Sequence, residues 1–408
     1  MRKVLAIILA LAMVLSFAAC GKKEDPKPAE NQPEEKKAVK VGLICIGDEN
    51  DQGYTYNFLR GQKAAAEQLK KDGYDVEWVI KYNLIAGAPV ADANRDLAEA
   101  GCKIIFNNSY DHAFEIPAVA ADYPDIHFVG MTNENLWNDD AKNTSNAFAE
   151  IYKGRYLAGV VAGLKLQEMI DKGEIKADEA VIGYVAAYYY AEVVSGYTAY
   201  FLGAQSVCPS VKMITQAVSS WSDATAEGDA AKALIARGAK MISQHSDNTT
   251  PATEAEKAGV FHTGYNNDMS GIAPKASIIS TRIDWTKYFV DTVEAAIDGK
   301  EIPGDYTGKY ADGEIILTEL NKAIAAEGTE AKLAEIEAKL AKGEIKVYDT
   351  SKFTVGGQPL TQAFALDTNG DWVPDKYEAV EGGEFKESFY QSAPYFAIDI
   401  DGITKIDQ

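Results

Sequence analysis

Four segments of the sequence, each next to an apolar run, carry aromatic rings together with amides, hydroxyls and isolated aspartates. These segments are residues 50–57 (NDQGYTYN), 107–114 (NNSYDHAF), 243–251 (SQHSDNTTP) and 262–270 (HTGYNNDMS). Aromatic rings offer flat apolar contact, and amides and carboxylates give directional hydrogen bonds. Lysine, arginine and the glycine-rich turns that bind phosphate are scarce in these segments. The residue types therefore predict the binding of a flat, uncharged ligand with many hydrogen-bonding groups.

Further aromatic residues follow other apolar runs. Trp221 lies in SSWSDA, Trp285 lies in RIDWTKYF, and tyrosines occupy positions 188–190. Taken singly, such a ring packs at the end of a strand more often than it stacks on a ligand, and Asp51 or Asp247 would equally suit a helix cap or a turn. The recurrence of these residue types after several apolar runs favours a binding site.

The patterns typical of enzymes are not present in the sequence. The histidines are His112, His127, His245 and His262. None of them has the HExxH spacing of a metalloprotease, and the consecutive residues of HSD at 245–247 do not face one another as a catalytic triad would. The chain has neither a GxSxG elbow nor a Walker A motif. We therefore expect a binding protein that has no catalytic residues and no cofactor.

One late segment, residues 367–378 (DTNGDWVPDKYE), has the spacing of oxygen ligands that is typical of a calcium loop. The ligands would be Asp367, Asn369, Asp371, Asp375 and Glu378. The sixth position of such a loop requires glycine for its sharp turn, and Trp372 occupies it here. We therefore favour an ordinary acidic surface loop over a metal site.

The N-terminal residues predict export and lipid anchoring. A short basic start, MRK, precedes the apolar run VLAIILALAMVLSFAA, which ends directly before Cys20. This order is typical of a signal peptide, and a cysteine after FAA resembles a bacterial lipobox. We expect a signal peptide over residues 1–19 and a lipidated Cys20. Residues 20–38 are rich in Lys, Glu and Pro and predict a disordered spacer, which places the protein outside the cytoplasm on the cell membrane.

The rest of the chain alternates short apolar runs with helical patterns. Such alternation predicts an α/β fold of parallel sheets with right-handed crossovers. It occurs twice, so we expect one doubly wound lobe over residues 39–150 and a second over 151–285, with a ligand cleft between them. Residues 286–408 are expected to hold hinge crossings that return in part to the first lobe. Within them, the charged segment 330–346 predicts a solvated surface helix.

Charge and cysteine content exclude other classes of protein. The formal net charge of −21 opposes binding to nucleic acid, which needs basic patches. After removal of the signal peptide and modification of Cys20, the cysteines that remain are Cys45, Cys102 and Cys208. Their odd number and their apolar surroundings predict buried small side chains and no disulfide framework.

Several segments resemble the basic membrane protein (BMP) family of ABC transporter substrate-binding lipoproteins, which includes purine nucleoside receptors. The segments are DQGYTYNFLRG, AADYPDIHFVGM, GRYLAGVVAGL, ARGAKMISQHSDN, GYNNDMSGIAPKASIISTRIDWTKYF, FTVGGQPL and SAPYFAIDIDGI, between residues 51 and 403. The resemblance implies a type I periplasmic-binding-protein fold and a monomer that captures its ligand by closure of two lobes. It also implies ABC permease and ATPase subunits as partners.

The resemblance implies a purine ligand and favours an adenine-like base. A nucleoside and riboflavin are alternatives for the ligand, and a ligand-sensing subunit of a signalling receptor is an alternative for the function. The positions that match the family's ligand segments are Tyr54, Tyr56, Asn57, Ser109, Tyr110, Asp111, Trp221, His245, Ser246, Asp247, Tyr265, Asp268 and Trp285. We expect Trp221 and one of the two first-loop tyrosines to enclose the ring. Hydrogen bonds are expected from Asn57, Asp247 and Asp268, with Tyr54 and Tyr56 placed in a loop before the first helix.

Overall fold

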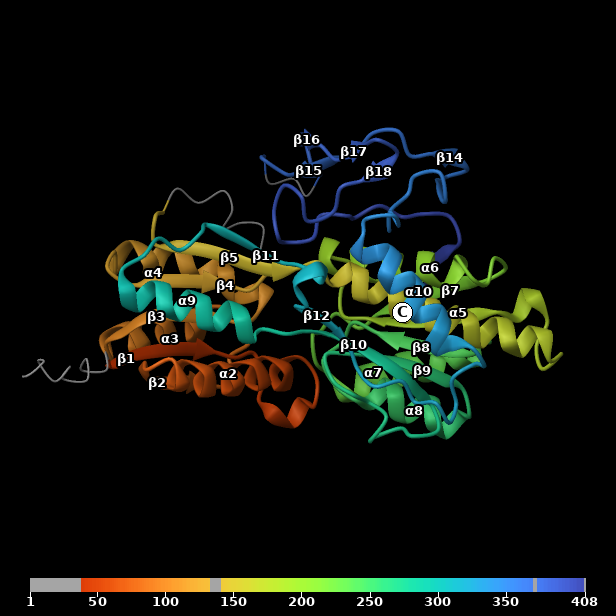
Figure 1. Cartoon of the computed structure of the whole chain (residues 1–408), viewed down its shortest axis with the longest axis horizontal. Helices are drawn as coiled ribbons and strands as arrows, with labels where there is room; N and C mark the ends of the chain where they lie inside the picture. The colour runs from red at the N-terminus through yellow and green to blue at the C-terminus, as the bar shows by residue number, and fades with distance from the viewer. Residues whose placement is uncertain (1–37, 133–140, 370–372, 407–408) are drawn as a thin grey trace, which may run out of the picture. The chain divides into compact units, whose positions relative to one another are not determined.

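The apolar runs form the parallel strands of two separate sheets (Figure 1). A computed structural model describes residues 38–132, 141–369 and 373–406, which belong to the compact unit Lys37–Gln408. The first sheet has the strand order β11-β5-β4-β3-β1-β2, and the second has the order β12-β10-β9-β8-β6-β7-β19. The predicted α/β fold with two parallel-sheet lobes is confirmed. Cys20 and the N-terminal segments predicted around it lie outside the described residues.

The strands have the following bounds. In the first sheet they are β1 (Ala38–Ile44), β2 (Asp75–Lys81), β3 (Cys102–Asn107), β4 (His127–Gly130), β5 (Thr144–Ala149) and β11 (Asp305–Gly308). In the second sheet they are β6 (Val181–Ala186), β7 (Lys212–Ala217), β8 (Met241–Gln244), β9 (Phe261–Tyr265), β10 (Ser277–Ile283), β12 (Ile315–Leu317) and β19 (Ile403–Lys405). Neighbouring strands are parallel in both sheets, except that β12 pairs antiparallel with β10.

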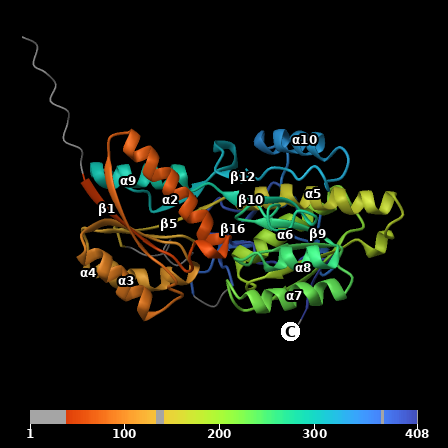
Figure 2. The ribbon, with the colours of Figure 1, turned by 90° about the horizontal axis from the view of Figure 1, so that it is seen from below.

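Helices cover both faces of each sheet, as their buried apolar residues require (Figure 2). On the first sheet, α2 (Tyr54–Lys71) and α9 (Thr286–Asp298) lie on one face, and α3 (Ala88–Glu99) and α4 (Ile116–Asp122) lie on the other. On the second sheet, α5 (Ile151–Asp171) and α6 (Ala191–Gln205) lie on one face, with α10 (Thr329–Ala341) packed against α5, and α7 (Ala224–Ala236) and α8 (Thr250–Ala258) lie on the other face. Each lobe is therefore a three-layer sandwich.

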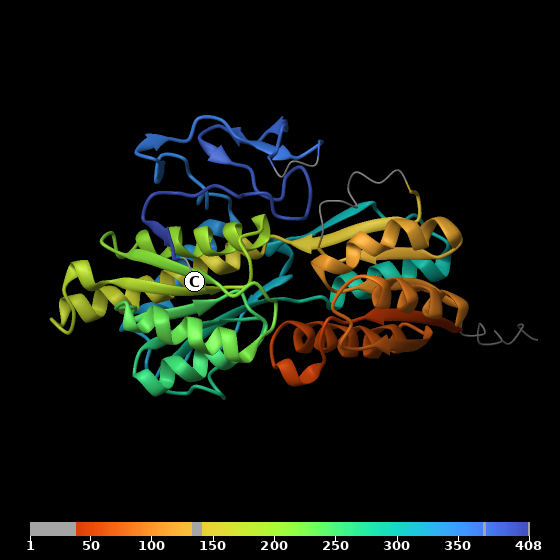
Figure 3. The same ribbon diagram turned by 180° about the vertical axis from the view of Figure 1, so that it is seen from behind.

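The chain crosses between the two sheets at three points in its described part. The crossings lie between β5 and α5, between β10 and α9, and between β11 and β12. After β12 the chain forms α10 and then a segment of short hairpins (Figure 3). These hairpins are β13–β14 (Thr354–Val355 and Gln358–Pro359), β15–β16 (Phe364–Leu366 and Lys376–Glu378) and β17–β18 (Val380–Glu381 and Glu384–Phe385).

Two glycines allow α5 and α6 to pack backbone to backbone. A Cβ atom on Gly159 would lie 1.9 Å from the carbonyl oxygen of Tyr200, and one on Gly203 would lie 2.0 Å from that of Tyr156. Contacts this short exclude any side chain at either position. Gly159 of GRYLAGVVAGL and Gly203 of α6 (Ala191–Gln205) thus fix the two helices against each other, and these helices carry residues of the site described below.

Three local expectations differ from the structure. Tyr54 and Tyr56 form the first turn of α2 and are not in a loop, because the Asp51 carboxylate accepts hydrogen bonds from the N–H groups of Gly53, Thr55 and Tyr56 at 2.7–3.0 Å and starts the helix there. Strand β5 was missed because its sequence, TSNAFA, is barely apolar. The helix predicted as solvated, α10, buries one face through Leu333, Ile336 and Leu340.

The three remaining cysteines, Cys45, Cys102 and Cys208, are free and buried, as predicted. Burial also raises the pKa of the Cys102 thiol to about 11, so this side chain stays a neutral apolar group at physiological pH. Within the described residues no helix is both long enough and apolar enough to cross a bilayer.

Candidate functional site

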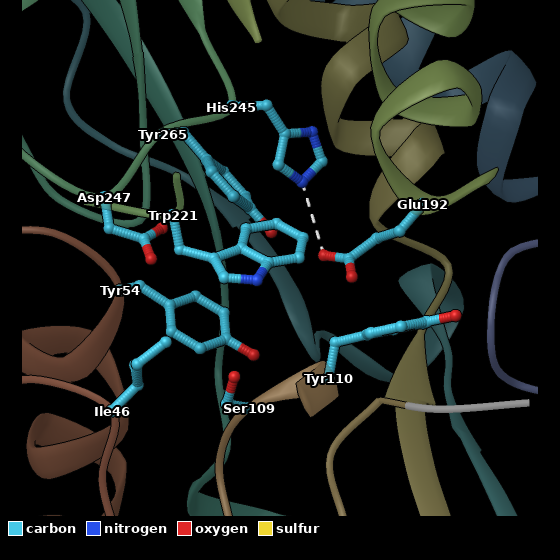
Figure 4. Close-up of a pocket in the computed structure, with 9 residues that line it drawn as sticks. All are labelled: Ile46, Tyr54, Ser109, Tyr110, Glu192, Trp221, His245, Asp247 and Tyr265. Carbon is cyan, nitrogen blue, oxygen red and sulfur yellow. Dashed lines mark hydrogen bonds and ion pairs between the residues drawn. The ribbon is translucent and has the colours of Figure 1, made fainter. Parts of the chain in front are cut away.

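A small cavity lies between the two lobes (Figure 4). Ile46, Tyr54, Ser109 and Tyr110 line it from the first lobe, and Glu192, Trp221, His245, Asp247 and Tyr265 line it from the second. Its volume is about 10 Å³, which is room for roughly one water molecule. A ligand of the size of a heterocyclic ring therefore enters only when the lobes or the aromatic side chains move apart.

The lining residues sit where the strands direct them. Ile46 follows β1, Ser109 and Tyr110 follow β3, and Tyr265 ends β9. Tyr54 also follows β1, at the start of α2, and the other residues of the second lobe (Glu192, Trp221, His245 and Asp247) follow β6, β7 and β8. All of these positions are at the carboxyl ends of parallel strands, where ligands bind in open α/β sheets.

Aromatic rings from both lobes form one cluster beside the cavity. Figure 4 shows the Tyr54 ring on one side of the Trp221 indole. Trp221 makes an edge-to-face contact with Tyr188, with ring centroids 5.2 Å apart. Tyr188 stacks on Tyr190 at 4.7 Å, and Tyr190 stacks in turn on Tyr110 of the first lobe at 5.3 Å. Residues of both lobes thus form the aromatic wall.

The cavity wall is acidic. Asp247 and Glu192 are only 5% and 6% exposed, and no lysine or arginine occurs among the described residues that line the cavity. Burial raises the pKa of the Asp247 carboxyl well above its usual value, and the nearby carboxylates of Asp51, Glu227 and Glu192 raise it further. The cavity wall therefore carries buried carboxyl groups and no basic side chain, which suits a neutral or cationic ligand better than an anionic one.

A neutral histidine lines the cavity beside Glu192, and a buried arginine lies close to it. His245 Nε2 lies 3.3 Å from Glu192 Oε1, and burial together with the Arg155 charge holds the pKa of His245 well below its usual value. The Arg155 guanidinium stacks 3.5 Å from the centroid of the Tyr265 ring and donates from Nη1 to the Gln244 carbonyl at 2.8 Å. Arg155 is a cation at the site that the sequence analysis missed.

A second buried carboxyl connects the two loops that carry Trp221 and Asp247. Glu227 accepts hydrogen bonds from the N–H of Asp223 at 2.9 Å and from the Asn248 side chain. The N–H of Asp247 donates to the Trp221 carbonyl at 2.9 Å. Burial raises the pKa of Glu227 to about 7. The positions of the indole and the Asp247 carboxyl are thus linked through the backbone and through this one side chain.

The first lobe contacts the second directly at the cavity. A Cβ atom on Gly53 would lie 2.1 Å from the Asp247 carbonyl oxygen, so only glycine allows this approach. Further along α2, Arg60 Nη2 donates to Asn267 Oδ1 at 2.8 Å. The start of the first helix therefore closes onto the loops of the second lobe.

Of the residues predicted for the site, the structure brings to the cavity Tyr54, Ser109, Tyr110, Trp221, His245, Asp247 and Tyr265. It places several others elsewhere. Asn57 is buried and donates from Nδ2 to the Ile283 carbonyl at 2.9 Å, at the end of β10. Trp285 stacks on Phe58 in the core of the first lobe at 4.7 Å. The ring of Tyr56 lies under the Arg60 guanidinium at 5.0 Å.

Three more predicted residues lie near the cavity but do not line it. Asp111 accepts a hydrogen bond from Trp221 Nε1 at 3.0 Å. Ser246 is buried between His245 and Asp247, and its carbonyl accepts from Gln244 Nε2 at 3.0 Å. Asp268 is exposed and closes a turn by accepting from the Ser270 N–H at 2.9 Å.

Two lining residues, Ile46 and Glu192, were not predicted from the sequence. Ile46 is an ordinary apolar residue next to a strand and carries no signal of binding. Glu192 is the second residue of α6, two positions after the tyrosines at 188–190. The position of those tyrosines at the end of a predicted strand was the available signal, and extending that segment into the helix would have included the carboxylate.

The late acidic loop shows its carboxylates engaged within the protein. Asp367 accepts from the Asn369 N–H at 3.1 Å, and Asp375 accepts from Thr368 Oγ1 at 2.8 Å. Glu378 accepts from the side chain of Gln362, and Asp371 lies outside the described residues. In the part of the chain that the structure describes, no three His, Cys, Asp or Glu residues are grouped as a metal site requires.

Two doubly wound lobes with a cavity at their strand ends define a solute-binding protein, a class that binds small molecules without transforming them. Residues 38–351 match the model of the family of PnrA-like ABC transporter substrate-binding proteins, Bmp, and the chain belongs to this family. The family assignment and the expectation that the protein is not an enzyme are confirmed. Such proteins bind small-molecule ligands outside the cytoplasm and work with permease and ATPase subunits.

Known proteins agree with this assignment. A purine-binding protein of Brucella abortus is 32% identical over 81% of this chain and 91% of its own length. A putative ABC transporter glucose-binding protein of Haloferax volcanii is 29% identical over 79% of this chain and 77% of its own length. A solved solute-binding protein of Aeropyrum pernix, 14% identical, has a TM-score of 0.61 over 82% of this chain and 95% of its own, which shows a common fold.

The raised pKa of Glu227 predicts a pH dependence of stability. A carboxyl whose pKa is about 4.5 in the unfolded chain and about 7 in the folded protein binds its proton more tightly when folded. The stabilisation of the folded protein by the protonated carboxyl is therefore complete below pH 4.5, and it is lost as the pH rises from about 4.5 to about 7. The Glu227→Gln variant keeps the accepting oxygen and cannot ionise. We expect the free energy of unfolding of this variant to fall by on the order of 3 kcal/mol less than that of the wild type across this pH range.

Urea unfolding at pH 5 and pH 7.5 measures this difference. Glu254→Gln is a suitable control, since Glu254 lies on the neighbouring helix α8 and pairs with exposed Lys257. If the wild type and Glu227→Gln change in stability by the same amount between the two pH values, Glu227 is ionised in the folded protein and the assignment is wrong.

Proposed function

We propose that this protein captures a purine base or nucleoside outside the cytoplasm and delivers it to an ABC permease, with an adenine-like base as the preferred ligand. The observation that carries the proposal is the pairing of aromatic rings with buried carboxyls in one interlobe cavity. The Tyr54 and Trp221 rings offer flat faces, and Asp247 and Glu192 offer acceptors. The purine-binding relative from Brucella abortus supports the same ligand class.

The acidic wall favours a ligand that donates hydrogen bonds. Adenine has an exocyclic amino group and a ring N–H, and both can donate to carboxylate oxygens while the ring stacks between aromatic side chains. A nucleotide is disfavoured, because its phosphate would enter a low-dielectric site next to Asp247 and Glu192 with no lysine or arginine among the described lining residues. Free bases and nucleosides fit these constraints better than phosphorylated ligands.

Capture follows from the two-lobe construction. A ligand that contacts residues of both lobes, such as Tyr54 and Trp221, interacts fully only with the closed form and so shifts the population toward closure. The contact surfaces of the closed lobes, including Gly53 against Asp247, are then held together by the ligand. The closed form is the one that we expect the permease to recognise.

Isothermal titration calorimetry with a ligand panel tests the proposal. The panel consists of adenine, guanine, adenosine, inosine, riboflavin and glucose. We expect one ligand per chain of a monomer, with adenine bound most tightly and glucose not bound. If riboflavin binds most tightly, the ligand is a flavin and not a purine. The absence of heat with every purine would refute the proposal.

The Trp221 indole is expected to contribute stacking energy to this binding. Trp221→Ala should weaken adenine binding at least about tenfold, or about 1.4 kcal/mol, with the fold retained. Phe389→Ala serves as the matched control, because Phe389 is an aromatic residue that is 68% exposed and lies outside the cavity. An unchanged dissociation constant in Trp221→Ala would assign the indole to packing only.

Anchoring through Cys20 completes the proposal. The signal-like residues 1–19 end directly before this cysteine, and residues 20–38 have the composition of a flexible tether. Cys20→Ser should move the protein from the membrane fraction to the soluble fraction and abolish incorporation of labelled palmitate. If the variant still sediments with membranes and still incorporates palmitate, the lipid is attached elsewhere.

The alternative of a sensing subunit uses the same binding site but a different partner. In that case the closed form would dock on a signalling receptor in place of the permease. Uptake of labelled adenine by cells that lack the protein distinguishes the two functions. Uptake is lost if the protein serves transport, and it is unchanged if the protein serves sensing.

A further inference from the structure

Asp111 and Trp221 form a direct hydrogen bond between the lobes. Asp111 lies in the short 3-10 helix η2 (Tyr110–Glu115) after β3 of the first lobe, and Trp221 lies between β7 and α7 of the second. Trp221 Nε1 donates to Asp111 Oδ2 at 3.0 Å. The indole itself lines the cavity, whereas Asp111 does not.

The hydrogen bond fixes more than the indole. The Trp221 carbonyl accepts from the Asp247 N–H at 2.9 Å, so the indole and the Asp247 loop move together. Next to Asp111, Tyr110 stacks on Tyr190 of the second lobe, and Tyr190 in turn packs against the Trp221 ring at 6.2 Å. The hydrogen bond of the Trp221 indole thus comes from the first lobe, and its aromatic neighbour Tyr190 is itself stacked on a first-lobe ring.

We propose that Asp111 is a positioning residue that holds Trp221 in its ligand-facing orientation only when the lobes are closed, and so sets how long a ligand stays bound. This inference rests on the proposed function. The carboxylate is half-buried and accepts a single directional N–H, an arrangement that is lost when the lobes separate. An interaction present only in the closed form stabilises that form and slows release, while the encounter of ligand with the open form is unaffected.

Rapid-mixing kinetics with adenine tests the inference. Asp111→Ala removes the acceptor, and Trp221→Phe removes the donor but keeps an aromatic ring. We expect Asp111→Ala to raise the dissociation rate constant about tenfold and to leave the association rate constant within about twofold. Asp111→Asn retains an acceptor oxygen and should recover most of the slow release. Glu115→Ala, which removes a negative charge from the same 3-10 helix, is the matched control.

The double variant separates positioning from independent effects. If Asp111 acts through the indole N–H, Asp111→Ala should add no more than about twofold to the dissociation rate constant of Trp221→Phe. Two results would overturn the inference. One is a wild-type dissociation rate constant in Asp111→Ala, and the other is multiplication of the two single effects in the double variant.

A ligand-free measurement separates this inference from the proposed function. Spin labels at Lys70→Cys on α2 and Lys257→Cys on α8 occupy exposed positions on different lobes, and Cys45, Cys102 and Cys208 are buried. With Cys20→Ser as background, pulsed electron paramagnetic resonance reports the distance between the lobes. We expect Asp111→Ala to populate longer distances than Glu115→Ala. A wild type that binds no purine contradicts the proposed function. Identical distance distributions in the wild type and in Asp111→Ala contradict the inference about Asp111, whether or not a purine binds.

Discussion

The burial of the Asp247 carboxyl is the constraint on which the rest of the site depends. Its side chain is 5% exposed, its neighbours Asp51, Glu192 and Glu227 are also acidic, and Arg155 is separated from the cavity by the Tyr265 ring. A buried carboxylate without a partner is costly, and a neutral carboxyl still needs hydrogen bonds. We therefore propose a ligand that brings N–H or O–H donors on a flat frame.

The fold shows how this constraint is assembled. Parallel strands place their following loops at one edge of each sheet, and the three crossings bring the two edges face to face. The glycine contacts between α5 and α6 fix the helices that carry Arg155 and Glu192. Lobe closure then adds the first-lobe residues. Ligand binding and the contacts between the lobes are consequently expected to favour the same closed arrangement of the lobes.

Much of the fold could be predicted from the sequence, because apolar runs and helix caps are local signals. Strands such as β1 and β6 are continuous apolar runs and were expected at the right places. Strand β5 was not, since Thr144, Ser145 and Asn146 give no apolar pattern and the strand depends on its neighbours β4 and β11. The start of α2 was misplaced because acid and amide residues suit both loops and helix caps.

The site was only partly predictable for a related reason. The carboxyl ends of the strands indicate which loops lie near a ligand, but they do not indicate where each side chain points. Asn57 has the polar character of a ligand contact, yet its amide bonds to the Ile283 carbonyl across the fold. Trp285 packs in a core that forms from segments distant in sequence. Arg155 lies in an apolar helix, and its proximity to Tyr265 follows only from tertiary packing.

We propose that a flat, donor-rich ring binds between Tyr54 and Trp221 against the Asp247 carboxyl. A crystal structure of the protein, purified without refolding and crystallised with adenine, tests this binding mode. We expect planar density between the two rings, with a nitrogen of the ligand within hydrogen-bonding distance of Asp247. Density for adenine at any other place, or closed lobes with the two rings still in the positions described here, would contradict it.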